Sequence, residues 1–144
     1  MHIHGRWAFK IDKNNILLVK VMDAWNVEAA VAFSEEFKRV SMALVEQPWA
    51  ILISTQHGEL MVQEALPVLQ DLNKWTVENN CRCEASIVKY QIQKEVFDRT
   101  RACGEYEYIQ RAFFDFSSAT QFLADRGFTP QSNEQDIADW FAVK

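Results

Sequence analysis

The residues of this chain that could do chemistry follow one short apolar run in the sequence. The run covers residues 49–53, and the polar side chains that follow it are Ser54, Thr55, His57, Glu59 and Glu64. In α/β domains, ligands usually bind where a central strand ends and the chain turns into the next helix. We therefore predict a binding or catalytic site within residues 54–66. His57 is the best candidate for acid–base work, because histidine titrates near neutral pH.

An enzyme built on His57 would use Glu59 or Glu64 as the partner acid. The alternative is that His57 belongs to plain solvated surface, since no nucleophile stands beside it. The chain contains only four glycines, Gly5, Gly58, Gly104 and Gly127. Their spacing excludes the glycine-rich nucleotide-binding patterns, and the G-x-S-x-G and H-E-x-x-H signatures are absent too. The sequence therefore favours a protein that is not an enzyme.

Three apolar side chains interrupt the same polar segment: Met61, Val62 and Leu66. Exposed apolar surface on a loop tends to mark a binding site. The alternative is that these side chains fold down onto the core. Together with Ser54, Thr55 and His57 they form the candidate site, whose predicted partners are an apolar small molecule, a membrane surface, a protein or a second copy of the chain.

The cysteines and the remaining histidines do not predict a metal site. Cys81 and Cys83 form a C-x-C pair whose side chains would share one face of a strand. Zinc would need two further ligands, which His57 and Cys103 could supply only by chance of folding. His2 and His4 could form half a metal site, but a flexible N-terminus is the simpler interpretation. We expect free thiols, no metal and no cofactor.

Composition narrows the classes of partner and the compartment. The chain has 144 residues and a net charge of −5, with its Lys and Arg spread singly among acids, which argues against a nucleic-acid surface. It shows no secretory signal pattern and no apolar run long enough to span a membrane. A cytoplasmic location is the expectation.

Hydrophobic periodicity predicts the elements that must position the candidate site. Alternation over Arg6–Asp12 and an apolar run over 16–21 predict a β-hairpin, with the second strand deeper in the sheet. Asn26 is a good N-cap for a helix that ends before Pro48. Residues 49–53 then predict a central strand covered on both faces.

The second half continues the alternation of helix and strand. It predicts a helix from Pro67 to about residue 79, a strand over 82–90, a helix over 93–103 and a strand over 106–114. Ser117 or Ser118 would cap a short helix that ends at Gly127. We predict one domain over residues 1–127, followed over 128–144 by a linker and an amphipathic helix.

This order of elements predicts an α/β fold with a mixed sheet of about five strands that opens with a hairpin, four helices and the C-terminal helix. The order resembles STAS domains related to the anti-sigma-factor antagonist SpoIIAA, and more closely the small bacterial SpoIIAA-like proteins. The likeness covers residues 5–127. It is carried by the opening strand pair, Trp25 before the first helix, the Pro48-Trp49 pair and Trp75.

The resemblance implies a regulatory domain, but the phosphorylation site of the STAS antagonists differs in this sequence. In STAS antagonists the loop after the central strand carries Asp-Ser-Ser-Gly, and a partner kinase phosphorylates one serine. Here residues 58–65 contain neither an Asp nor a hydroxyl. Only Ser54 and Thr55 remain as phosphoacceptors, and hydroxyls at a strand end more often bond to backbone groups. The resemblance also implies that some members hold apolar small molecules or touch membranes, so a non-enzymatic binding domain is the leading prediction. The alternatives are a small enzyme using His57 and a phospho-switched regulator.

Overall fold

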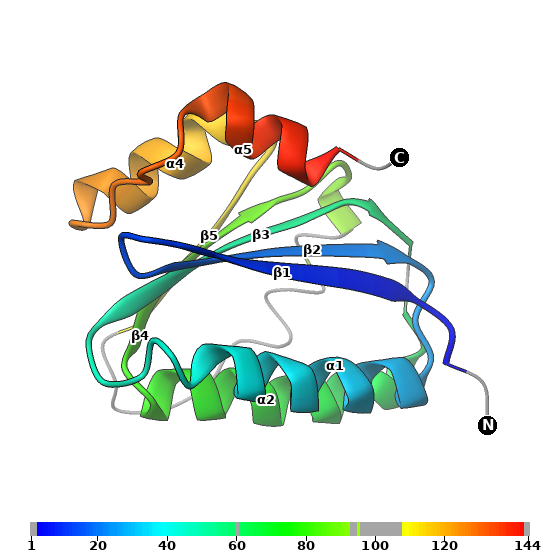
Figure 1. The fold of residues 1–144 in the computed structure, drawn as a ribbon. Coiled ribbons are helices and arrows are strands. Elements are labelled where there is room, and N and C mark those ends of the chain that lie inside the picture. Colours follow the sequence, from blue (N-terminus) through cyan, green and yellow to red (C-terminus); the bar gives the residue numbers. More distant parts are fainter. Residues whose placement is uncertain (1–2, 60, 93–94, 96–107, 143–144) are drawn as a thin grey trace.

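A five-stranded mixed sheet separates two layers of helices (Figure 1). The computed structural model describes residues 3–59, 61–92, 95 and 108–142. The strand order is β1-β2-β3-β4-β5, in which β1 runs antiparallel to β2 and the other neighbours are parallel. The predicted fold class, with its opening hairpin and its deeper second strand, is confirmed.

The bounds of most elements lie close to the predicted ones. The strands are β1 (Arg6–Asp12), β2 (Ile16–Asp23), β3 (Trp49–Gly58), β4 (Cys81–Ile87) and β5 (Ile109–Phe113). The helices are α1 (Val27–Ser41), α2 (Leu66–Glu78), α4 (Phe116–Asp125) and α5 (Glu134–Phe141), with a 3-10 turn η1 (Gln63–Ala65) before α2. The helix predicted over 93–103 lies almost entirely outside the described residues.

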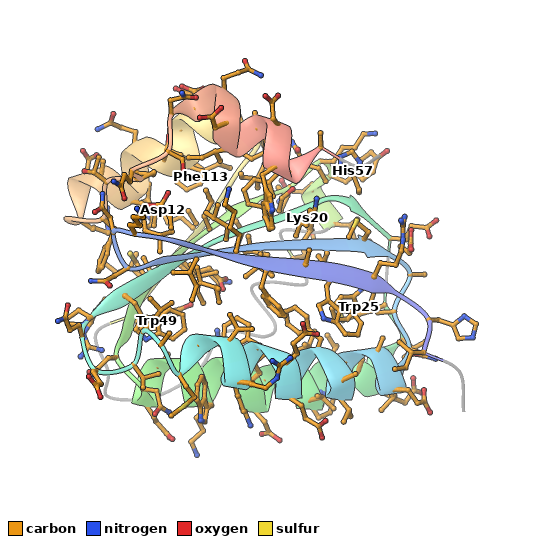
Figure 2. The ribbon with its side chains drawn as sticks, in the orientation of Figure 1. Asp12, Lys20, Trp25, Trp49, His57 and Phe113 are labelled. Carbon is orange, nitrogen blue, oxygen red and sulfur yellow. The ribbon has the colours of Figure 1, made fainter. Side chains whose placement is uncertain are left out.

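Helices α1 and α2 cover one face of the sheet (Figure 1). Asn26 caps α1 as predicted, because its side chain accepts the N–H of Ala29. Aromatic rings fill this layer, and Figure 2 shows Trp25 and Trp49 on the α1 side of the sheet. Its rings are Trp7, Phe9, Trp25, Phe33, Phe37, Trp49 and Trp75. They touch in a chain with centroid separations from 4.8 to 6.5 Å, so their large apolar areas leave water together.

Helices α4 and α5 cover the opposite face. The predicted serine cap of α4 is wrong: Asp115 caps this helix by accepting the N–H of Ser118, since it stands one residue before the first helical turn. Gly127 ends it with φ of +90°, as expected for a helix C-terminus. From α5, Ile137 and Phe141 are each 2% exposed within the core of this layer.

Two polar contacts fasten the C-terminal segment to the sheet. Lys20 on β2 donates from Nζ to the carbonyl of Trp140 at 2.7 Å and lies over its ring. Asp12, at the end of β1, accepts the backbone N–H groups of Gln131 and Ser132 at 2.9 and 3.2 Å. Burial alone would raise the pKa of Asp12, but these donors outweigh it, so the pKa lies below its ordinary value. Asp12 therefore acts as a charged backbone anchor for this segment.

Candidate functional site

Strand β3 is longer than predicted, which moves three of the candidate site residues. It was expected to end at residue 53, but it continues to Gly58 because β2 also continues, pairing Met22 with His57 and Asp23 with Gly58 after a bulge. Ser54, Thr55 and His57 therefore belong to the strand and not to a loop. The segment that connects it to the next helix is residues 59–65, called the β3–α2 segment below.

The two hydroxyls bond to backbone groups at the end of this strand. Ser54 is 2% exposed, and its Oγ accepts the N–H of Gln56 at 3.3 Å. Thr55 donates from Oγ1 to the carbonyl of Ile87 on β4 at 3.3 Å. Both side chains thus bond to backbone groups near the end of the strand, and the side chain of Ser54 is buried.

The three acid–base candidates are exposed and spread over different elements. Figure 2 shows His57 near the end of β3, at the edge of the molecule. Glu59 follows the strand, and Glu64 is exposed in the 3-10 turn. Of the three, only Glu59 lines the cavity described below.

The β3–α2 segment is bound to the chain that enters α1. Glu59 donates its N–H to the carbonyl of Asp23, and Val62 donates its N–H to the carbonyl of Trp25, both at 3.0 Å. Between these anchors Met61 turns inward and packs against the aromatic layer. Val62 remains 43% exposed, whereas Leu66 is half-buried as the first residue of α2.

A cavity of about 120 Å³ lies between the sheet and helices α1 and α2. It extends from the carboxyl end of β3 to the middle of the sheet, where β3, β4 and β5 lie side by side. Most of its lining is apolar: Val21, Trp25, Phe33, Phe37, Ile51, Ile53, Met61, Leu69 and Leu72. Thr55 and Met61 are the predicted site residues that line it. Ser54, His57, Val62 and Leu66 lie outside the lining.

The middle of the sheet brings into this cavity an acid that lies outside the predicted site, Glu84. Glu84 on β4 is 7% exposed, next to Ile51 on one side and Gln110 on the other. Its Oε2 accepts from the side-chain amide of Gln110 and from Ser86 Oγ. Burial raises the pKa of the Glu84 carboxyl from 4.5 to about 7, against the opposing effect of these two hydrogen bonds.

Further polar groups surround Glu84. Asn73 and Thr76 on α2 line the same end of the cavity. The carbonyl oxygen of the Gln110 side chain is buried without a hydrogen-bond partner among the described residues. The hydroxyl of Tyr108 is also buried without a hydrogen-bond partner of normal geometry among the described residues. Burial raises the pKa of Tyr108, and the nearby side chain of Asn73 opposes this rise. The lining is thus mostly apolar, and Glu84 and Gln110 form a buried polar end in the middle of the sheet.

The cysteine pair departs from the prediction because a bulge interrupts the pairing of β3 with β4. Cys81 belongs to the α1 and α2 layer, whereas Cys83 belongs to the α4 and α5 layer, so the two thiols lie on opposite faces. Burial raises the pKa of both, to about 11 for Cys83. Within the described part of the chain, no three potential ligands gather into a metal site. Cys103 and His2 lie outside that part.

No protein-family model and no curated protein sequence matches the chain. Among the helices that the structure describes, none is long and apolar enough to cross a bilayer.

Solved structures do match the fold. An uncharacterised protein of the DUF3478 family with a SpoIIAA-like fold, from Shewanella loihica PV-4, aligns with a TM-score of 0.61 and 13% identity, over 85% of this chain and 96% of that one. The anti-sigma factor antagonist SpoIIAA in its unphosphorylated form aligns with a TM-score of 0.56 and 8% identity, over 85% of this chain and 97% of that one. An anti-sigma factor antagonist from Mycobacterium paratuberculosis aligns with a TM-score of 0.54 and 13% identity, covering 83% and 96%. The chain has the SpoIIAA-like fold of STAS domains.

Proposed function

We propose that this domain is a non-enzymatic binding module that holds a small apolar molecule between the sheet and helices α1 and α2. The observation that carries the proposal is the cavity of about 120 Å³, whose lining is mostly apolar. A cavity of roughly 150 Å³ lined by Leu, Ile and Phe can stay dry and bind benzene. A single ring or a short branched chain therefore fits the scale of this one.

The position of the cavity supports a regulatory use of that ligand. Met61 and Glu59 come from the β3–α2 segment and contribute to the lining, while Val62 in the same segment is exposed. A ligand that contacts Met61 would thus also bias the backbone that presents Val62. Two fold neighbours are anti-sigma factor antagonists, which favours a protein as the partner that would sense this segment.

Filling the cavity should abolish ligand binding without unfolding the protein. Leu69 on α2 is half-buried and lines the cavity, whereas Leu66 on the same helix is half-buried outside the lining. With ethylbenzene as the probe, wild-type protein is expected to show amide chemical-shift changes in β3 and α2. Leu69→Trp should lose them, because the larger side chain occupies the probe's volume.

Leu66→Trp is the matched control and should bind ethylbenzene as wild type does. The proposal fails if ethylbenzene leaves the spectrum of the wild-type protein unchanged up to its solubility limit. It also fails if Leu69→Trp and Leu66→Trp bind the probe equally well.

A further inference from the structure

The geometry points to a more specific ligand: we infer that the cavity selects an apolar molecule that ends in a primary ammonium group, with that group held at Glu84 and Gln110. This inference rests on the proposed function, since it names the chemistry of the molecule that occupies the cavity. A fatty acid is the simplest expectation for an apolar site, but the polar end of this cavity disfavours a carboxylate.

Two acceptor oxygens at the polar end receive no hydrogen bond from a described residue. Both hydrogen bonds to the Glu84 carboxylate from described residues reach Oε2, and none reaches Oε1. Gln110 uses its amide N–H₂ to bond to Glu84, which leaves its buried Oε1 without a donor in the described part of the chain. An ammonium group carries three N–H donors and no acceptor. It can therefore satisfy both oxygens at once.

The charges along the cavity favour the same ligand. Its ionisable lining residues are Asp23, Glu59 and Glu84, and no Lys or Arg lines it within the part of the chain that the structure describes. Asp23 is paired with Arg6 at the surface, at 2.6 Å. Glu59 is exposed, so Glu84 is the charge that a ligand meets inside.

The buried carboxylate of Glu84 has no cation beside it among the lining residues that the structure describes, which is unfavourable in free energy. Removing an ionised group from water is unfavourable unless an opposite charge compensates for it. A ligand ammonium beside Glu84 supplies that charge in a medium of low dielectric constant, where the attraction is strong. A ligand carboxylate would instead place two like charges together, and an alcohol would supply a donor without the charge.

The ionisation of Glu84 can be followed by measuring ligand binding at different pH values, because the groups around it do not titrate in the same range. Tyr108, Cys81 and Cys83 interact electrostatically with Glu84, and burial raises the pKa of each above its ordinary value, so all three stay neutral below pH 8. The remaining lining from α1, α2 and β3 next to Glu84 is uncharged, with Phe37, Asn73 and Ile51 as examples. A pH dependence of amine binding between pH 6 and 8 therefore reports the Glu84 carboxyl.

The test compares three probes that share one apolar body: 2-phenylethylamine, 2-phenylethanol and 3-phenylpropanoate. Binding to the wild-type protein is measured at pH 8 by calorimetry and by amide chemical shifts. We expect the amine to bind at least about tenfold more tightly than the alcohol, as a charge-assisted hydrogen bond in a buried site allows. The carboxylate should bind most weakly. On going from pH 8 to pH 6, amine affinity should fall by about tenfold, because Glu84 must first release a proton.

Glu84→Gln keeps the shape of the side chain and one acceptor oxygen but removes the negative charge. It is expected to bring amine affinity down to that of the alcohol, and to remove the pH dependence. His57→Gln, outside the cavity lining, is the control and should keep the preference for the amine.

Equal affinities for amine and alcohol in the wild-type protein would overturn the inference while leaving the proposed function intact. The same holds if Glu84→Gln keeps the amine preference. Should none of the three probes nor ethylbenzene bind, the inference and the proposed function fail together.

Discussion

Ending the chain at Pro130 is expected to lower the free energy of unfolding by roughly 3–6 kcal/mol, because two buried side chains of α5 are lost. Ile137 and Phe141 are each 2% exposed, and they cover apolar residues of β2 and β3 in the α4 and α5 layer. The truncation also removes the N–H donors of Gln131 and Ser132, which leaves the 4%-exposed Asp12 carboxylate with fewer partners. Small domains have a total stability of about 5–15 kcal/mol, so the truncated protein should unfold at a clearly lower urea concentration.

Urea unfolding followed by circular dichroism measures this effect. Phe141→Ala in the full chain should reproduce a large part of the loss, at about 3–5 kcal/mol. Glu134→Ala, an exposed change in the same helix, is the control and should have little effect. An unchanged unfolding midpoint in the truncated protein would show that α5 contributes no stability.

Replacing Glu84 by Gln should stabilise the protein in a manner that depends on pH. The pKa of Glu84 is raised from 4.5 to about 7 in the folded state. The folded protein therefore keeps a proton that the unfolded chain has already released between these values. Wild-type stability falls as pH rises from 4.5 to 7, and the loss stops above pH 7. The full loss amounts to about 3 kcal/mol, and Glu84→Gln avoids it.

The measurement is the difference in unfolding free energy between wild type and Glu84→Gln at pH 5, 6, 7 and 8. The difference should grow in favour of the variant up to pH 7 and then level off. Glu59→Gln, at an exposed position, should track the wild type at every pH. Stability curves of wild type and Glu84→Gln that run parallel over this range would show that the buried carboxyl is not destabilised.

The local rules of the sequence predicted most of the scaffold. The alternation in β1 and the Asn26 cap depend on neighbours in the chain, and both are confirmed. The end of β3 was missed because the polar residues Gln56 and His57 have no strand signal of their own. They are strand residues because β2 extends beside them, which is a non-local cause.

The cavity was only partly predictable for the same reason. Met61 was singled out for its apolar side chain in a polar segment, and it does line the cavity. Glu84 lies in the segment that was predicted only as a strand over 82–90. A parallel strand between two others is buried on both faces and is usually apolar. A glutamate at the centre of such a strand was therefore the available sign of a buried polar site. Gln110 gave no signal, because only the pairing of β4 with β5 brings it to Glu84.

The anchor at Asp12 has a consequence for the order of folding during synthesis. Its hydrogen bonds to Gln131 and Ser132 join positions 119 and 120 residues apart. The first hairpin can pair as soon as it leaves the ribosome, but its buried aspartate must wait for almost the whole chain before these donors arrive. Contacts of such long sequence separation slow folding. Until then, the face of β2 and β3 that α5 covers stays open to water, and that nascent surface is where a chaperone would act.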